Sequence, residues 1–373
     1  MAFDNFLKDK LLKREAEGLL RKLSLNDNLI DFCSNDYLGW SRDENLKKKV
    51  LSRFSESQYR LGSSGSRLIS GNTLFIEELE QKIASYHKAE SALIFNSGYD
   101  ANVGFFSCVP AKGDTVIYDE LIHASIRDGI RLGLAKSYSF VHNDLEDLKK
   151  KIKLAQGNVF VAVEAVYSMD GDEAPLKELC DLGVNLIVDE AHSMGVYSEY
   201  GEGLVVKFGL ENKVYARLVT YGKAFGAHGA AVLGSSVLRN YLVNFARSFI
   251  YTTAGSEFHL LTIDEIYNQK EELRKRISKV HELNNYFLKG VKEIENKFIL
   301  SSSLIHCLVV GNNNACMKIE SVLRSQKFAV KAILSPTVPK NKERIRLSIH
   351  YHNDFSEIKD LLEVLKENIV NLN

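Results

Sequence analysis

The amino-acid sequence predicts an α/β protein, with a large domain built on a mostly parallel sheet and a smaller α+β domain after it. The chain has 373 residues, 45% of them hydrophobic, which is enough for a large buried core and for about two domains. Between residue 91 and about residue 235, short apolar segments alternate with helical segments. This alternation is typical of parallel strands whose sheet is covered by helices on both faces.

The first ninety residues predict two helices and a short strand. An amphipathic helix is expected over residues 4–23, ending before Asn26 and Asn28. Residues 29–33, with the sequence LIDFC, predict a short strand. Residues 75–89 repeat apolar positions at helical spacing and therefore predict a helix.

Six short apolar segments are candidate strands of the large sheet. They are residues 92–96, 115–119, 159–166, 185–190, 217–222 and 230–234. Helical segments follow several of these strands, as expected in a parallel sheet. Open α/β sheets bind their ligands at the edge where the strands have their carboxyl ends. Polar residues directly after these strands are therefore the first candidates for a functional site.

The last part of the chain predicts the smaller domain. A long charged helical region is expected over residues 262–298. After it we expect strands at 305–311, 328–334 and 344–349 and helices at 315–327 and 355–370.

Three divisions of the chain follow from this pattern. Residues 1–40 hold the N-terminal helix and strand, residues 41–265 form the large domain, and residues 266–373 form the small C-terminal domain. The boundary between the last two falls close to the start of the long charged helix, because the alternating strands end before it.

The composition excludes several functional classes. Lys plus Arg and Asp plus Glu each total 48, so the net charge is zero, which argues against a nucleic-acid binder driven by overall charge. The five cysteines form no CxxC pair, which argues against a zinc site and favours a reducing compartment. The N-terminus is charged throughout, and no apolar run reaches the roughly 18–20 residues that span a bilayer. We expect a cytoplasmic protein without a membrane partner.

Two strands end in residues that can do chemistry. Asp189 closes a buried apolar strand, where a carboxylate is costly unless it is paired or hydrogen-bonded. Lys223 lies between Gly222 and Gly226 just after another strand, and a lysine amine can form a Schiff base with a carbonyl cofactor. Taken alone, Asp189 could cap the next segment, and Lys223 could be a surface lysine in a turn.

Three further strands end in the same way. Gly98 and Tyr99 follow the first strand and open a helix, and backbone N–H groups at such a turn can hold a phosphate. His123 and Ser168 follow two other strands. Each could be structural by itself. Together, four strands bring an N–H-rich turn, an imidazole, an Asp and a Lys to one edge of one sheet. This is the set that pyridoxal 5′-phosphate (PLP) needs: a lysine for its aldehyde, a carboxylate for its ring nitrogen, an aromatic cover and phosphate donors.

At this point the sequence resembles the α-oxoamine synthases, a branch of the fold type I PLP-dependent transferases, over nearly the whole chain. The matching segments are SNDYLG (34–39), GSSGSRLISGN (62–72), FNSGYDAN (95–102), DELIHAS (119–125), EAVYSMDGD (164–172), VDEAHSMGV (188–196), TYGKAFGAHGAAV (220–232), FARSFIYTT (245–253) and PTVPKNKERIRLS (336–348). The resemblance implies the fold type I architecture, with a mostly parallel seven-stranded sheet in the large domain.

The resemblance also implies roles for single residues around PLP. Lys223 would carry the cofactor and later remove the substrate's α-proton, Asp189 would pair with the ring nitrogen, and His123 would stack on the ring. Ser168 and His192 would lie near the phenolic oxygen. The phosphate would be held by Gly98, Tyr99, Thr220 and, from a second subunit, Thr253. A homodimer with a shared active site is therefore implied.

Substrate residues follow from the same resemblance. Arg346 would bind the amino-acid carboxylate in a bidentate pair, Asn35 would lie near Lys223 and the cofactor, and Thr337 would contact substrate. Arg21 matches an arginine that binds the far carboxylate of a pimeloyl chain, although an exposed helix residue is the alternative.

Within the family, the sequence most resembles the 8-amino-7-oxononanoate synthases. The segment AFGAHGAAV carries an alanine pair typical of them, and the chain lacks the N-terminal extension common in serine palmitoyltransferases. The implied reaction joins L-alanine to a pimeloyl thioester, carried by CoA or an acyl-carrier protein, in biotin biosynthesis. Glycine C-acetyltransferase, serine palmitoyltransferase and a non-catalytic partner subunit are the alternatives. Leu334 stands where these synthases often have an arginine, and nearby Lys331 need not replace it. The identity of the acyl chain that the protein uses therefore stays open.

Overall fold

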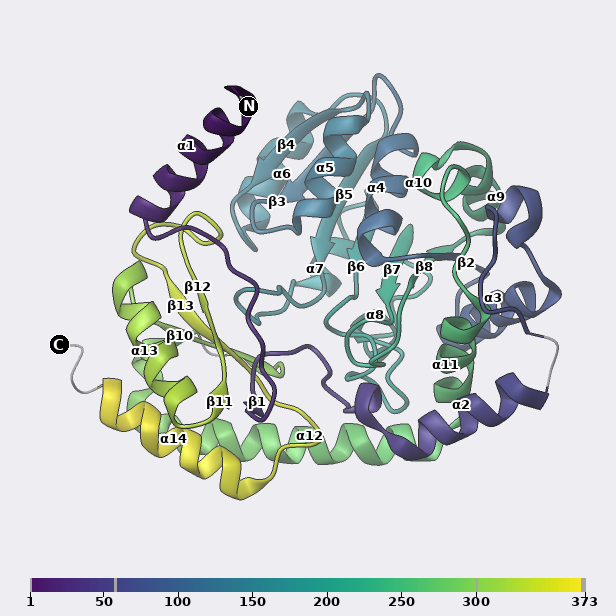
Figure 1. Cartoon of the computed structure of the whole chain (residues 1–373). Helices are drawn as coiled ribbons and strands as arrows, with labels where there is room; N and C mark the ends of the chain where they lie inside the picture. The colour runs from purple at the N-terminus through teal and green to yellow at the C-terminus, as the bar shows by residue number, and fades with distance from the viewer. Residues whose placement is uncertain (1, 57–58, 300, 370–373) are drawn as a thin grey trace. The chain divides into compact units, whose positions relative to one another are not determined.

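The computed structural model describes residues 2–56, 59–299 and 301–369. The chain forms two compact units, which are coloured by residue number in Figure 1. The larger unit comprises Asn35–Ser168 and Asp172–Val280, and the smaller comprises Met1–Ser34, Met169–Gly171 and His281–Asn373. The predicted ranges 1–40, 41–265 and 266–373 stay a prediction, because the division into these units does not test them.

A seven-stranded sheet forms the centre of the larger unit. Its strand order is β2-β8-β7-β6-β5-β3-β4. Only β8 runs antiparallel to its neighbours; the other pairs in the sheet are parallel. The strands are β2 (Ser91–Phe95), β3 (Thr115–Asp119), β4 (Lys136–Phe140), β5 (Val159–Glu164), β6 (Asn185–Asp189), β7 (Ala216–Thr220) and β8 (Ala230–Gly234). This confirms the predicted α/β architecture and its mostly parallel sheet.

Within the seven-stranded sheet, β4 is the strand that the apolar pattern did not predict. Its sequence, KSYSF, contains one strongly apolar residue, and most of its side chains are exposed. It lies at the end of the sheet next to β3, and no strand of the described residues pairs with its other edge. An edge position allows polar side chains, so no apolar segment marks the strand in the sequence.

Helices α4 and α5 pack together against the sheet and close the main core of the larger unit (Figure 1). Phe105 and Phe106 of α4 and Ile126 of α5 are buried with strand residues such as Val116 and Leu218. The helical segments are α2 (Glu44–Glu56), α3 (Leu74–Tyr86), α4 (Gly98–Cys108), α5 (Ala124–Leu132), α6 (Leu145–Leu154), α7 (Leu176–Cys180), α8 (Leu204–Lys207), α9 (Ser236–Phe245), α10 (Arg247–Ile250), α11 (Glu257–Asn268), η1 (Trp40–Arg42) and η2 (Arg67–Gly71).

The smaller unit combines an antiparallel sheet of order β12-β13-β10-β9 with helices, as predicted for an α+β domain. A second, two-stranded sheet pairs β1 with β11 in parallel. The elements are α1 (Ala2–Ala16), β1 (Ile30–Asp31), η3 (Lys292–Lys297), β9 (Phe298–Ile299), β10 (Ile305–Val309), α13 (Asn313–Ser325), β11 (Phe328–Ala329), β12 (Lys331–Ile333), β13 (Arg344–Ser348) and α14 (Phe355–Ile369). Helix α12 (Lys270–Gly290) begins in the larger unit and ends in the smaller.

Two predicted helices differ most from the structure; the helices predicted over 75–89, 315–327 and 355–370 are shifted by one to three residues at their ends. The first ends at Ala16 rather than 23, because Gly18 adopts a left-handed φ of 67° and the Leu19 N–H donates to the carbonyl of Arg14, which caps the helix. The long region predicted over 262–298 holds two α-helices, α11 and α12, separated at Gln269, whose φ of −104° and ψ of 48° are not helical; η3 and the start of β9 follow them.

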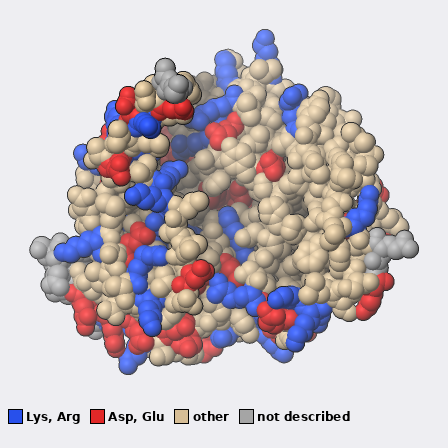
Figure 2. Space-filling model, viewed as in Figure 1, with Lys and Arg blue, Asp and Glu red and all other residues tan. Residues whose placement is uncertain are grey.

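Basic and acidic side chains are mixed on the surface, as the zero net charge leads us to expect. Figure 2 shows basic and acidic side chains interspersed over the face that it draws. Among the described residues, none of the helices has the length and the apolar character needed to span a membrane.

Candidate active site

Lys223 and Asp189 line one cavity of the larger unit, as the PLP hypothesis requires. The cavity has a volume of about 280 Å³ and lies where the parallel strands have their carboxyl ends. Its lining contains Asn35, Gly98, Tyr99, Asn102, His123, Ser125, Glu164, Asp189, Ala191, Leu218, Val219, Thr220, Gly222 and Lys223. The edge of the sheet that was predicted to bind ligand therefore carries a real pocket.

The amine of Lys223 is held by a histidine. The lysine follows β7, in a turn that is closed when the Gly226 N–H donates to the carbonyl of Lys223. Its Nζ lies 2.8 Å from Nε2 of His192. The other ring nitrogen of His192 is 2.7 Å from the hydroxyl of Tyr37, and this hydroxyl donates to Oδ1 of Asn35 over 3.3 Å. A chain of polar contacts thus orients the amine.

Asp189 is the last residue of β6 and is buried. Its Oδ2 accepts a hydrogen bond from Nδ2 of Asn102 over 2.9 Å, and its Oδ1 accepts from the backbone N–H of Ala191 over 2.9 Å. The carboxylate is therefore fixed in orientation at the cavity wall. Asn102, which the sequence reasoning missed, comes from α4 and also donates to Oγ of Ser125.

His123 caps the N-terminus of α5. Its Nδ1 accepts the backbone N–H of Ser125 over 3.2 Å and lies 2.6 Å from Oγ of the same serine. Burial lowers the pKa of His123, and the positive charge of Lys223 adds to this effect although Asp189 opposes it. The ring is thus kept neutral, and because Nδ1 is an acceptor, the ring proton resides on Nε2.

Glu164 is a second residue that the sequence reasoning missed. It ends β5, is buried and lines the cavity. Its Oε2 accepts the N–H of Ser168 over 3.3 Å, whereas its Oε1 has no hydrogen-bond partner among the described residues. Burial and the nearby charge of Asp189 raise the pKa of Glu164 to about 8, although Lys223 and backbone N–H groups oppose the shift. Glu164 is therefore mostly a neutral acid at pH 7.

The N-terminus of α4 is the part of the cavity wall that was predicted to hold the cofactor phosphate. Ser97 caps this helix by accepting the N–H of Asp100, and Gly98 is its first residue. A Cβ added to Gly98 would lie 3.5 Å from Oγ1 of Thr220, an ordinary van der Waals distance, so Gly98 lies directly beside this hydroxyl. Tyr99 is half-exposed and donates to Oδ2 of Asp128. One wall of the cavity therefore contains the N-terminus of α4, the hydroxyl of Thr220 and Gly98, which has no side chain.

Other predicted residues lie outside the lining of this cavity. Ser168 is linked to it through Glu164, and Thr253 accepts a hydrogen bond from Asn96 with its backbone carbonyl. In the smaller unit, Arg21 and Thr337 line a separate cavity of about 810 Å³, together with Leu334. Arg346 lies on β13, is nearly buried and donates to Oγ of Ser348.

The chemistry of the cavity fits PLP. It offers an amine, a buried oriented carboxylate, a neutral imidazole and a helix N-terminus. Two buried side-chain oxygens that line it, Oδ1 of Asn102 and Oε1 of Glu164, have no hydrogen-bond partner among the described residues. Buried polar atoms without partners are costly, and a polar group bound in the cavity can satisfy them.

The chain belongs to the aminotransferase class I and II family, whose pattern it matches over residues 27–365. It is 38% identical to the 8-amino-7-oxononanoate synthase of Emericella nidulans, over 96% of this chain and 94% of that protein. Its fold is similar to that of 8-amino-7-oxononanoate synthase from Francisella tularensis, with a TM-score of 0.81 and 29% identity over 92% of this chain and 99% of that one. It is also similar to a structure of SPT with PLP, with a TM-score of 0.84 and 26% identity over 92% and 88% of the two chains.

These comparisons confirm several predictions. The family and the fold type I architecture are those expected from the sequence motifs. PLP as cofactor and a PLP-dependent transferase as the class of enzyme are confirmed as well. The roles of single residues stay predictions, because the comparisons do not test them.

Proposed function

We propose that the protein is a synthase of the 8-amino-7-oxononanoate kind. It joins L-alanine to a pimeloyl thioester and releases carbon dioxide and the free thiol carrier, as a step of biotin biosynthesis. The observation that carries this proposal is the pairing of a Lys223–Asp189 cavity with 38% identity to a relative of that name over nearly the whole chain. The proposed reaction balances with these two substrates and these products, so it needs no oxidant and no reductant.

PLP, when bound, supplies an electron sink for the negative charge that develops at the α-carbon of the amino acid. Lys223 takes the α-proton with its Nζ, and His192 keeps that amine in place. Asp189 supplies the fixed negative charge that keeps the cofactor's ring nitrogen protonated. His123, with its proton on Nε2, donates a hydrogen bond to the oxygen that becomes negative when the thioester is attacked.

Further contacts are proposed from the family resemblance. Gly98, Tyr99 and Thr220 hold the cofactor phosphate with Thr253 of a second copy, so the active enzyme is a homodimer. Ser168 and His192 lie near the phenolic oxygen, and Asn35 lies near Lys223. Arg346 binds the carboxylate of alanine, whereas Arg21 and Thr337 contact the acyl chain. A cytoplasmic location follows from the same proposal.

A matrix of substrates tests the proposed reaction. Release of free thiol is measured with alanine, glycine or serine, each combined with pimeloyl-, acetyl- or palmitoyl-CoA. Alanine with the pimeloyl thioester is expected to give the highest kcat/KM. A preference for glycine with acetyl-CoA or for serine with palmitoyl-CoA would replace the proposed substrates and leave the family unchanged.

An absorbance measurement tests whether the chain is catalytic or only a partner subunit. After incubation with PLP, the protein is expected to show a band at about 410–430 nm, from cofactor bound to the lysine. The band should be absent in Lys223→Ala. A protein that stays colourless would support the non-catalytic alternative.

A further inference from the structure

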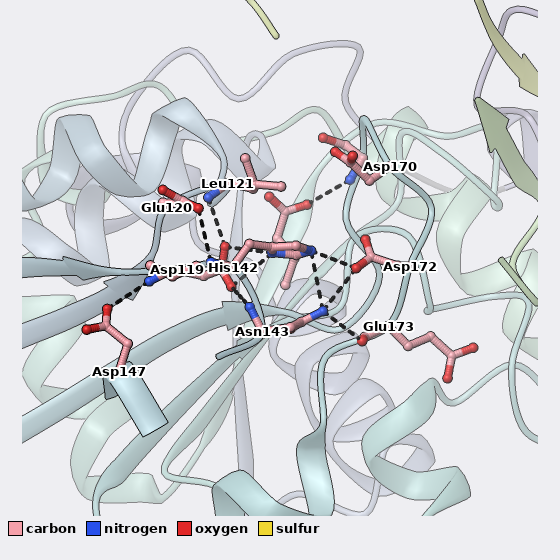
Figure 3. Close-up of polar contacts among 12 residues, drawn as sticks. Asp119, Glu120, Leu121, His142, Asn143, Asp147, Asp170, Asp172 and Glu173 are labelled. Carbon is pink, nitrogen blue, oxygen red and sulfur yellow. Dashed lines mark hydrogen bonds and ion pairs between the residues drawn. The ribbon is translucent and has the colours of Figure 1, made fainter. Parts of the chain in front are cut away.

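His142 forms a cross-link between two segments of the larger unit that lead to the cavity. Figure 3 shows its ring between two carboxylates. Its Nδ1 lies 3.0 and 3.1 Å from the two oxygens of Asp119, and its Nε2 lies 2.6 Å from Oδ2 of Asp172. The edge of the ring of Tyr167 packs against it, with centroids 4.5 Å apart and an interplanar angle of 88°. None of the mechanistic steps proposed above uses these residues.

The geometry requires both ring nitrogens of His142 to donate. Carboxylate oxygens only accept hydrogen bonds, so an imidazole that contacts a carboxylate with each nitrogen must carry two protons and a positive charge. Burial opposes this charge, but the hydrogen bonds to Asp119 and Asp172 outweigh it and raise the pKa of His142 to about 10. At neutral pH the residue is therefore an imidazolium held between two anions.

The Asp119 end of this cross-link shapes the turn that carries His123. Asp119 is the last residue of β3, and its side chain is fully buried. Its Oδ1 accepts the N–H of Leu121 over 2.8 Å, and its carbonyl accepts the N–H of Ile122 over 3.0 Å. His123 is the next residue. The direction in which its ring enters the cavity thus depends on a turn that Asp119 organises.

The Asp172 end holds the hairpin that carries Ser168. The carbonyl of Asp172 accepts the N–H of Tyr167 over 2.9 Å, and Val166 forms an antiparallel bridge with Glu173. Asn143, which follows the histidine, donates to Oδ2 of Asp172 and to the carbonyl of Glu173. Ser168 therefore lies in a hairpin whose stem is fixed by His142 and Asn143.

We propose that His142 is a positioning residue for the cofactor pocket, which holds the turn before His123 and the hairpin of Ser168 at a fixed separation. This inference rests on the proposed function. It assigns a role to a histidine outside the cavity lining. His142 acts through the turn before His123, which lines the cavity, and through the hairpin of Ser168, which Glu164 links to the cavity. Loss of the imidazolium should loosen both segments and weaken cofactor binding, with a smaller effect on the overall fold.

The test compares His142→Gln with a matched buried histidine, His306→Gln. His306 lies on β10 of the smaller unit and is buried; among the described residues its side chain has one polar contact, 2.6 Å from Oδ1 of Asn284, and its ring stacks on Phe287. The dissociation constant of PLP is measured by titrating the absorbance band, and Tm is measured in parallel. His142→Gln should raise the dissociation constant about 10-fold, the size typical of supporting residues around a bound group, and His306→Gln should leave it within about 2-fold.

A double variant separates positioning from general destabilisation. If His142 acts partly through His123, adding His142→Gln to His123→Ala should weaken PLP binding by less than the change does in the wild-type protein. Equal effects in both backgrounds, or a dissociation constant for His142→Gln that matches the His306 control at a similar loss of Tm, would overturn the proposal. Should His142→Gln fail to fold, Asp172→Asn removes the charge at only one end and is expected to weaken PLP binding in the same direction.

These outcomes are distinct from a failure of the proposed function. A wild-type protein that binds PLP but condenses other substrates leaves the role of His142 intact. If the wild-type protein shows no cofactor band, the cavity is not a PLP site, and the proposed role of His142 fails with it.

Discussion

The cavity of the larger unit and the cavity of the smaller unit are built in different ways. In the first, residues at strand ends and on one helix are buried and linked by hydrogen bonds, as for Asp189 with Asn102. In the second, exposed residues before β1 face a segment around Pro336, and Leu23 is fully exposed. Rigid elements suit the chemistry that the family shares, whereas exposed connecting segments can vary, and the proposed function assigns recognition of the acyl chain to them. The predictions below test this division of roles.

The largest effect is expected at the centre of the first cavity. Lys223→Ala removes the amine to which the proposed function assigns PLP binding and removal of the α-proton, so thiol release should fall by at least about 10³-fold with every acyl-CoA. Lys112→Ala, at an exposed turn, is the control and should keep full activity. Substantial activity in Lys223→Ala would show that another group provides the base.

A smaller loss is expected when the buried carboxylate is neutralised. Asp189→Asn keeps the size of the side chain and can keep one hydrogen bond to Ala191, but it removes the charge at the cavity wall. We expect kcat to fall on the order of 10²-fold, the usual scale for a preorganised electrostatic group, while KM for the acyl thioester changes little. An unchanged kcat would exclude Asp189 from the chemistry.

The second cavity should affect specificity rather than chemistry. Arg21→Ala is expected to raise KM for the pimeloyl thioester about 10-fold, because one charge-assisted contact is lost, with kcat and the KM of alanine unchanged. Lys22→Ala changes a charge in the lining of the same cavity and serves as the matched control. Equal effects of the two variants would indicate general attraction of an anion. A lower kcat would mean that the second cavity also affects the chemistry.

The smallest effect concerns pH and the neutral acid Glu164. Its pKa rises from 4.5 to about 8 on folding, so the folded state keeps a proton that the unfolded state loses. The free energy of unfolding therefore falls as pH rises from about 4.5 to about 8. Glu164→Gln cannot ionise, so Tm of the variant minus Tm of the wild type should increase by a few °C between pH 5 and pH 8. A constant difference would mean that Glu164 is ionised in the folded protein.

Strand ends explain why much of the first cavity was predictable. Asp189, Lys223 and His123 each follow a recognisable apolar segment, and parallel strands bring their carboxyl ends to one edge. Glu164 carried the same signal, a carboxylate closing a buried strand, and could have been found by the reasoning used for Asp189. The seven-stranded sheet was predictable for the same reason, apart from the polar edge strand β4.

Other parts of the site have no local signal. Asn102 lies inside a helix, and only the packing of α4 against the sheet brings it to Asp189. His142 follows β4, the strand that the apolar pattern does not mark, and its two carboxylate partners are 23 and 30 residues away along the chain. Contacts of this kind depend on tertiary structure, which residue spacing cannot predict.

The contacts that run from Lys223 through His192 and Tyr37 to Asn35 form a continuous hydrogen-bonded path. An imidazole can both give and receive protons, so His192 can take the charge that the lysine would acquire in the proposed reaction, while Tyr37 and Asn35 hold the imidazole in place. In the proposed reaction the amine can thus return to its basic form through a group of the protein itself.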